Sequence, residues 1–558
     1  MRKIYIILMA LPFLFASCQD WLDVNKDPNT PTDGYVNLLL PSAQGFLMSY
    51  NGGYMNYSLG NVTGTISHHM VLSGNSYSIT PTNFSVEQTW ESIYAGGQKD
   101  LSVIISKSKE KKLYQYEGVA MLMKAIEFTT FVDVWGKVPF SEATQDNTVS
   151  YPKFEDGAEI YPQLITMIDD AVAKLTYSGD DLNTTPSLAE GDMIYKGDVN
   201  KWIQLANTWK LRMINNLKRT PMFTEKGYDV VLAKLVQENN FIDANSPFEF
   251  EYGTSKVPEN RNPMYVNEYG NDEVTSYLIS HWFYESMKGT DGFIPFLKNI
   301  LDPRVPYYFY RQGQENPTPD YSNADLDFFT QRFGSTSQNL SSGFKNYTCL
   351  GVYVCGGKYD DGTQKPGNYG INGRGGSGRV PTRLVTEHDV YFILAELADG
   401  GFISGDAKTY LEQGMEKAFD YCDKTAAYDP NAPMLLDSDK ADYIAKILTQ
   451  YDNAVASFVN KPNVNPSSTC KLEVIMTQKW IADFGNSVAS YNDIRRTGFP
   501  RLFDPNTSDN DPETSTSFKF PYVLTYPGSS MINNKTIKDS GLDTRDITAE
   551  ENKVFWNK

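Results

Sequence analysis

Tyrosines gather in one part of this sequence, where their type and spacing suit ligand capture. They recur on the irregular stretch after Asp302, among Asn, Gly and Pro. A sugar presents an apolar ring face and a rim of hydroxyls, so its site needs flat aromatic surfaces ringed by polar groups. The predicted aromatic contacts are Tyr77, Trp282, Tyr308, Tyr310, Tyr353, Tyr359 and Tyr369, and the predicted polar contacts are Asn75, Arg311 and Asp360.

The sequence signals for a metal or a cofactor are weaker than those for an aromatic ligand site. His68 and His69 are adjacent, so their side chains diverge, and the other two histidines are far away in sequence. The glycine-rich run 373–378 lacks the strand and helix that a nucleotide fingerprint requires. The acidic stretches 360–361 and 504–513 lack the spacing of an EF-hand loop. We predict no cofactor and no metal site, with a structural calcium ion left as an alternative.

Catalysis is the main rival to binding. Glycoside hydrolysis needs two carboxylates that face one bond, and the chain has 68 acidic residues from which a pair could come. No nucleophile elbow, metal-binding helix motif or phosphate loop stands out. We therefore predict a binding protein and not an enzyme. The net charge of −18 also opposes polyphosphate binding and argues against nucleic acid as a partner.

The N-terminus resembles a secretory signal. Arg2 and Lys3 precede an apolar run that ends at Phe15, which is shorter than the roughly 20 residues that span a bilayer. The following Ala-Ser-Cys resembles a lipobox, which predicts a signal peptide at 1–17, lipidation of Cys18 and a tether at 18–34. Two or more acyl chains on Cys18 would give stable membrane attachment.

Four further cysteines would meet an oxidising environment after export, and their even number permits two disulfides. Cys349 and Cys355 could close a local hairpin, which would leave Cys422 to pair with Cys470. Free buried thiols are an equally weighted alternative.

Apolar residues at helical spacing predict a mostly helical scaffold. One stripe runs from Ile160 to Leu175 and another from Trp202 to Leu217. A helix over 384–397 breaks at two glycines and restarts after Asp406, as stacked helix pairs do. We expect one domain at 35–535, loop-rich insertions at about 245–275 and 302–383 that fold as short strands and turns, and a C-terminal tail at 536–558.

Seven short motifs in register resemble the SusD/RagB family of outer-membrane lipoproteins, in its starch-binding subgroup. They are WESIYA at 90–95, FVDVWGKVPFSEA at 131–143, GDVNKW at 197–202 with AN at 206–207 and KLR at 210–212, DPR at 302–304, AE at 395–396, QKW at 478–480 and RRTGFP at 495–500. The family's C-terminal basic and acidic residues are missing from PYVLTYPGSS at 521–530. We expect the motif residues Trp135, Trp202 and Trp480 to be core, and Arg495 and Arg496 to satisfy helix ends or carboxylates.

The resemblance implies a curved scaffold of tetratricopeptide-like helix pairs, with an irregular lobe that carries the ligand site. It also implies a cell-surface protein, lipid-anchored to the outer membrane, that captures an oligo- or polysaccharide and delivers it to a SusC-like TonB-dependent transporter. Peptide cargo, as in RagB-like members, is the first alternative, and a surface glycoside hydrolase is a weaker one.

Replacing the lipidation site tests the predicted anchor. Cys18→Ala should release a soluble protein or leave an unprocessed precursor, because no thiol remains to be acylated. Membrane fractionation with mass spectrometry of the N-terminus checks this. A mutant that still reaches the outer membrane with a lipid on its N-terminus would contradict the assignment.

Overall fold

The computed structural model of the chain describes residues 35–53, 58–71, 83–145, 149–269, 278–311, 328, 330–331, 333, 348–362, 376–462, 464–502 and 520–557. The predicted signal peptide 1–17, the lipidation site Cys18 and the tether 18–34 lie outside these residues.

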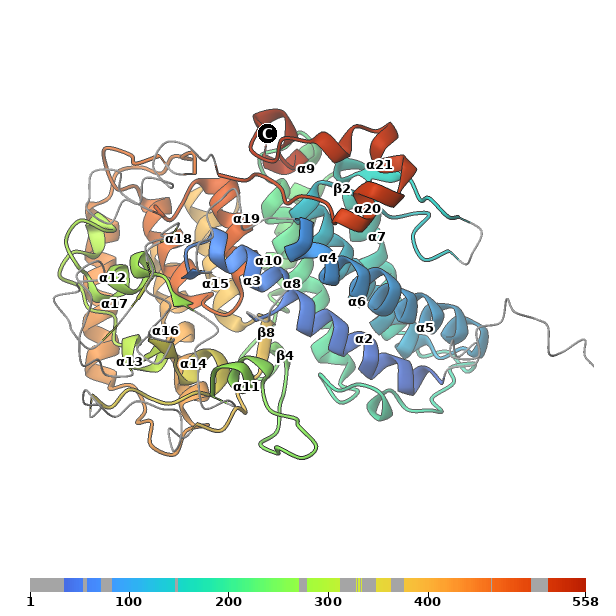
Figure 1. Cartoon of the computed structure of the whole chain (residues 1–558), viewed down its shortest axis with the longest axis horizontal. Helices are drawn as coiled ribbons and strands as arrows, with labels where there is room; N and C mark the ends of the chain where they lie inside the picture. Colours follow the sequence, from blue (N-terminus) through green and yellow to red (C-terminus); the bar gives the residue numbers. More distant parts are fainter. Residues whose placement is uncertain are drawn as a thin grey trace, which may run out of the picture.

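Helices make up most of the described chain, which confirms the predicted fold class (Figure 1). They are α2 (Val36–Asn51), α3 (Leu59–Ile66), α4 (Asn83–Glu91), α5 (Gln98–Lys111), α6 (Tyr114–Trp135), α7 (Gly157–Leu175), α8 (Val199–Leu217), α9 (Met222–Glu225), α10 (Tyr228–Glu238), α11 (Pro263–Tyr269), α12 (His281–Lys288), α13 (Val305–Tyr308), α14 (Val352–Cys355), α15 (Glu387–Asp399), α16 (Ala407–Ala426), α17 (Asp437–Asn453), α18 (Lys471–Ala482), α19 (Ser487–Thr497), α20 (Gly528–Asn533) and α21 (Lys535–Asp539).

The helix pair α15 and α16 forms as its sequence predicts. The Asp406 side chain accepts hydrogen bonds from the amides of Lys408 and Thr409, which caps the start of α16. Gly414 faces the ring of Phe392, and a Cβ at this glycine would lie 2.9 Å from ring atoms. Small residues on the packing face therefore let the two helices approach closely.

Two groups of helices form the scaffold. Helices α5 to α8 pack in chain order on the right of Figure 1, and α15 to α19 form a second group on the left. Contact between α8 and α15 joins the groups. Trp135, Trp202 and Trp480 are each at most 1% exposed, so the predicted core role of these motif tryptophans is confirmed.

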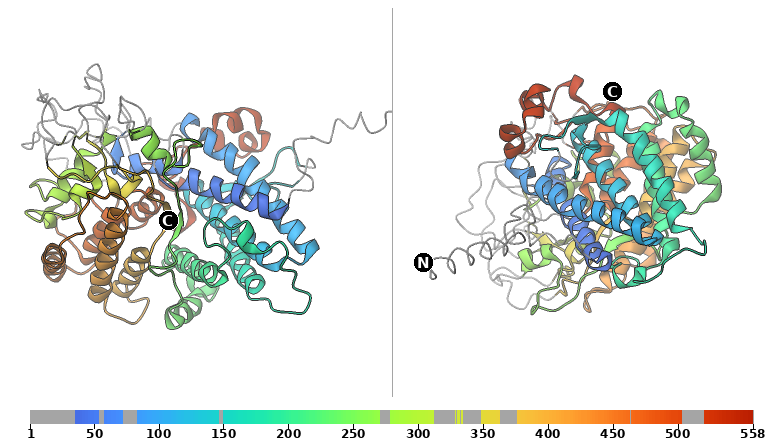
Figure 2. Two further views of the ribbon diagram at one scale, coloured as in Figure 1. Left: turned by 90° about the horizontal axis from the view of Figure 1, so that it is seen from below. Right: turned by 90° about the vertical axis from the view of Figure 1, so that its right-hand side faces the viewer.

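Short antiparallel strand pairs join segments that are far apart in the sequence. The pairs are β1 (Met70–Val71) with β5 (Leu278–Ile279), β2 (Lys137–Pro139) with β3 (Phe154–Asp156), β4 (Phe248–Phe250) with β8 (Thr382–Val385), and β6 (Phe309–Tyr310) with β7 (Cys349–Leu350). The β4–β8 pair joins the two loop-rich stretches that we expected to carry strands and turns. In Figure 2 (left), α11 to α14 lie over one side of the orange helices of the second group, and we call the described segments 245–269, 278–311, 348–362 and 376–385 the loop-rich lobe.

The C-terminal segment, which the sequence predicts as a tail at 536–558, packs onto the scaffold where the structure describes it. The indole of Trp556 is buried and donates a hydrogen bond of 2.9 Å to Asp133 Oδ1. Phe555 lies against Tyr161, and Arg545 donates to the carbonyl of Trp135. These apolar and hydrogen-bonding side chains give the segment a surface to bury.

All four cysteines of the described chain are free buried thiols, which is the alternative that the sequence left open, and the possible disulfides Cys349–Cys355 and Cys422–Cys470 do not form. The hairpin expected between Cys349 and Cys355 is absent because β7 turns at Gly351 into the helical turn α14. A Cβ at Gly351 would lie 2.3 Å from the carbonyl oxygen of Tyr307, so only glycine fits this turn. Burial raises the pKa of the Cys355 and Cys422 thiols and keeps them protonated.

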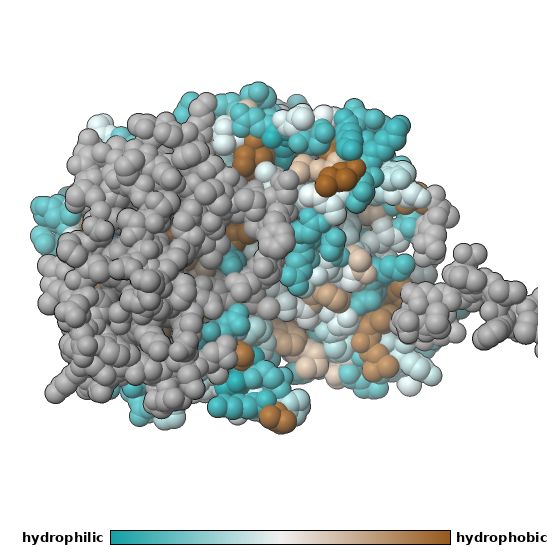
Figure 3. Space-filling view, viewed as in Figure 1, coloured by the Kyte–Doolittle hydropathy of each residue, from teal (hydrophilic) through white to brown (hydrophobic). Residues whose placement is uncertain are grey.

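Within the described residues, the helices are too short or too polar to cross a bilayer. The face in Figure 3 carries small separate apolar patches among hydrophilic residues.

Candidate functional site

Two predicted ligand tyrosines form a buried stack at the base of the loop-rich lobe. The rings of Tyr308 and Tyr353 lie 4.2 Å apart and nearly parallel. Their hydroxyls donate to the carbonyls of Ile481 and Ala482, at 3.2 and 2.7 Å. The guanidinium of Arg383 covers the Tyr353 ring at 4.1 Å. The stack therefore fastens the lobe to the C-terminal end of α18.

Two more predicted contacts are also core residues. Tyr310 is 1% exposed and lies in β6, where Lys358 sits 5.3 Å from its ring centre. Trp282 is 3% exposed, and its indole donates to the carbonyl of Arg501. A ring buried on both faces offers no platform to a sugar, so the ligand contacts predicted at Tyr308, Tyr310, Tyr353 and Trp282 are corrected to structural roles. A position in an irregular stretch therefore does not make a ring exposed.

Arg311 and Asp360 meet across the lobe. The Arg311 Nε lies 2.9 Å from the Asp360 carboxylate, which also accepts the Arg311 amide hydrogen bond. Burial raises the pKa of Asp360 although Arg311 opposes the shift. The two residues predicted as polar ligand contacts thus form an ion pair with each other.

Tyr359 remains available at the surface of the lobe. Its ring is partly buried and lies 4.8 Å from that of Tyr307, and its amide donates to Asp429. The ligand contact predicted at Tyr359 stays a prediction that this geometry permits. Those predicted at Asn75, Tyr77 and Tyr369 fall outside the described residues.

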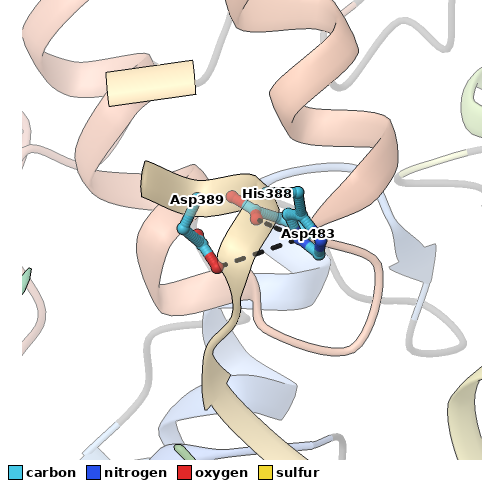
Figure 4. A group of neighbouring side chains, drawn as sticks. All are labelled: His388, Asp389 and Asp483. Atoms are coloured by element: carbon cyan, nitrogen blue, oxygen red, sulfur yellow. Dashed lines mark ion pairs between the residues drawn. The ribbon is translucent and has the colours of Figure 1, made fainter. Parts of the chain in front are cut away.

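A buried group of charged residues was missed by sequence reasoning. His388 and Asp389 begin α15, and Asp483 follows the end of α18 (Figure 4). The histidine Nε2 lies 3.8 Å from a carboxylate oxygen of each aspartate. Such residues could hold a metal ion in principle.

Lys479 already supplies the positive charge at this place. Its ammonium lies 2.7 Å from Asp483, 2.9 Å from Asp493 and 3.6 Å from Asp389. Burial alone would lower the pKa of Lys479, but these carboxylates hold it above its ordinary value. The three carboxylates therefore share the positive charge of this one ammonium.

The charge network continues through Asp493 to a second centre at Glu396. Arg496 bridges the two carboxylates, at 2.7 Å from Asp493 and 2.7 Å from Glu396. Lys218, the residue that follows α8, forms an ion pair with Glu396 from the other side, and Asn215 donates to the same carboxylate at 3.0 Å. Although burial would raise the pKa of Glu396, Arg496 and Lys218 hold it far below its usual range. We call these residues, with His388, Asp389, Lys479 and Asp483, the buried ion network.

Several motif residues meet in or beside this network. Glu396, Lys479 and Arg496 belong to it, and Asp133 lies close by, where it accepts hydrogen bonds from Tyr161, Asn492 and Trp556. Arg495 donates to the carbonyls of Asp133 and Tyr522, so the structural role predicted for both arginines is confirmed. The signal available in the sequence was the position of Glu396, Lys479 and Arg496 within the family-like motifs.

The helical scaffold, the lobe and these motif contacts define a class of helix-repeat proteins with a loop-rich face. A family model described as "Starch-binding associating with outer membrane" matches residues 38–527. The chain belongs to this SusD-like family. A search of curated proteins finds no match.

Solved structures of SusD homologues share the fold. One from Bacteroides uniformis has a TM-score of 0.65 at 19% identity and covers 94% of this chain and 100% of its own. A SusD/RagB family protein from Bacteroides thetaiotaomicron has a TM-score of 0.66 at 19% identity, with coverages of 94% and 99%. A chitin-binding SusD homologue from Flavobacterium johnsoniae has a TM-score of 0.66 at 19% identity, also with coverages of 94% and 99%.

Removing one carboxylate tests the buried ion network. Glu396→Gln should lower the free energy of unfolding by about 3–5 kcal/mol, because the buried Lys218 loses its counter-charge and Arg496 keeps only Asp493. Urea unfolding at neutral pH measures the change. In the wild type, the pKa of Glu396 is lower in the folded protein than in the unfolded chain, where it is about 4.3. The stabilisation by this carboxylate is therefore complete above that unfolded-state pKa, and it is lost as the pH falls through the lower pKa of the folded protein.

The matched control is Asp452→Asn, which breaks the exposed Lys408–Asp452 pair. It should change the free energy of unfolding by less than about 1 kcal/mol, because water screens that pair. Equal losses of unfolding free energy in the two variants would show that the buried ion network stabilises the protein no more than an exposed ion pair does.

Proposed function

We propose that this protein is a lipid-anchored protein of the outer-membrane surface that captures an oligo- or polysaccharide and delivers it to a SusC-like TonB-dependent transporter. The family match over residues 38–527, with its starch-binding and outer-membrane description, carries the proposal. The chitin-binding homologue of the same fold supports a glycan as the cargo class. The lipobox-like sequence before Cys18 supports the anchor.

The architecture suits capture. Loops that carry binding residues work best on a rigid scaffold, and here the lobe is fastened to α18 by Tyr308 and Tyr353. The partly exposed Tyr359 offers a stacking surface beside the polar Arg311–Asp360 pair. A lone surface protein has no energy source for import, so delivery to a transporter completes the role.

Two buried acids of the lobe are unsuited to hydrolysis. The Asp302 carboxylate accepts hydrogen bonds from Arg304 Nε and Nη2, at 2.9 and 2.6 Å, and the Asp360 carboxylate forms an ion pair with Arg311. A hydrolase would need a free pair of carboxylates that face one bond. This favours binding without turnover.

Copurification tests the partnership. Gentle detergent extraction of a tagged protein at native expression should yield a large TonB-dependent barrel in a stable complex, because delivery requires the two proteins to stay together. Mass spectrometry identifies the partner. Recovery of the lipoprotein alone would count against transporter delivery, whatever the cargo.

Cargo binding is tested at the accessible tyrosine. Tyr359→Ala should weaken glycan binding about tenfold, because one stacked ring contributes on the order of 1–3 kcal/mol in related aromatic stacking and 1.4 kcal/mol is one decade. Arrays of glycans and peptides would first identify the ligand, and calorimetry then measures the affinity.

Tyr151→Ala is the matched control, because that ring is 56% exposed and lies in the segment before α7. It should leave the affinity unchanged. Unchanged affinity in the folded Tyr359→Ala variant would place the ligand site elsewhere. Binding to peptides and to no glycan on the arrays would change the proposed cargo to peptide. New reducing ends after incubation of the protein with oligosaccharide would show that it is an enzyme.

A further inference from the structure

A cavity lies on the scaffold. It has a volume of about 320 Å³ and opens where the end of α8, the segment 459–462, α19 and the C-terminal residues meet. Figure 1 places the C-terminus beside α9 at the top of the view, with α11 to α14 of the lobe below. The cavity is thus separate from the face to which we assign cargo, and its test does not depend on the proposed function.

Positive charge dominates the cavity wall. The basic lining residues are Lys218, Arg219, Lys461, Arg495, Arg496 and Lys553. The described residues that line the cavity include no carboxylate, although the whole chain carries a net charge of −18. A concave site lined by one sign of charge concentrates ions of the opposite sign. The wall therefore favours an anion.

Two of these cations are largely uncommitted. Arg219 is exposed and forms no ion pair within the part of the chain that the structure describes. The Lys461 ammonium is exposed and lies 3.8 Å from Glu550, a loose pair that water screens. By contrast, Arg496 and Lys218 are bound to Glu396 behind the wall. The outer cations are thus the ones free to meet a ligand.

Buried donors without partners give an independent sign of a ligand. Arg496, 7% exposed, has its Nε buried without a hydrogen-bond partner, and so has Asn557 at its Nδ2. Both residues line the cavity. Buried donors are nearly always satisfied in native proteins, so an orphaned donor calls for an acceptor. Oxygen atoms of a bound molecule are one source of such acceptors.

The volume of the cavity and the asparagines in its wall narrow the class of ligand that it could bind. A volume near 320 Å³ lies at the lower end of small-molecule sites and exceeds what a simple inorganic anion fills. Asn215, Asn216, Asn460 and Asn557 also line the wall. The first three donate to Glu396, Asp133 and the Val464 carbonyl, which leaves the Nδ2 of Asn557 to donate to a hydroxyl oxygen. Guanidinium groups bind carboxylates through paired hydrogen bonds. We propose that this cavity binds a hydroxylated carboxylic acid of monosaccharide size, of the hexuronic acid class.

Calorimetry on the mature, folded protein with free monosaccharides tests the proposal. Glucuronate should bind, whereas glucose should bind at least tenfold more weakly because it leaves the cations unpaired. Inorganic phosphate should also bind at least tenfold more weakly because it cannot reach the amides. No binding of glucuronate, or equal binding of phosphate, would overturn the proposal without touching the glycan assignment for the lobe.

Variants locate the binding. Arg219→Gln with Lys461→Gln should weaken glucuronate binding at least tenfold, and Arg219→Lys should largely retain it. The control is Lys234→Gln with Lys535→Gln, which removes the same charge from exposed pairs on α10 and α21. Equal weakening by the control pair would show attraction by overall charge and would overturn the site. The comparison of glucuronate with glucose on the wild type needs no variant to fold.

Discussion

Charges buried between helices must be paired, and this requirement governs the packing of the scaffold. One buried network joins Lys218 directly after α8, Glu396 on α15, Lys479 on α18 and Arg496 on α19. A single misplaced helix would leave a charge without its counterpart in a medium of low dielectric, which costs several kcal/mol. Apolar stripes allow many helix arrangements, whereas this network favours the one in which every charge meets its partner.

The loop-rich lobe depends on the same helices. The last carbonyls of a helix lack intrahelical partners, and at the end of α18 the hydroxyls of Tyr308 and Tyr353 satisfy two of them. Arg383 donates to the carbonyl of Phe484 just beyond. The lobe is therefore attached where the ion network holds α18 and α15 together, and a loop surface with little regular structure acquires a fixed position.

Helix pairing could be read from the sequence because its causes are local. The apolar stripe of α7, the Asp406 cap and the glycine break before α16 act within a few residues, and the structure has all three. The short motifs could be recognised for a similar reason, because each lies within a few consecutive residues and the motifs follow one another in the family's order. The small strand pairs were expected only in outline, because β4 and β8 are far apart in sequence and their register is decided by folding.

The sequence by itself determined the family, the helical class and the residue types available for binding. It could not decide which tyrosines face solvent, because a ring in an irregular stretch is exposed or buried according to what packs over it, and Tyr308 and Tyr353 are covered by Arg383 and the end of α18. The ion network and the cationic cavity were also invisible, because each joins residues from α8 to the C-terminal half of the chain. Only tertiary packing brings such residues within the few ångströms over which charges and hydrogen bonds act.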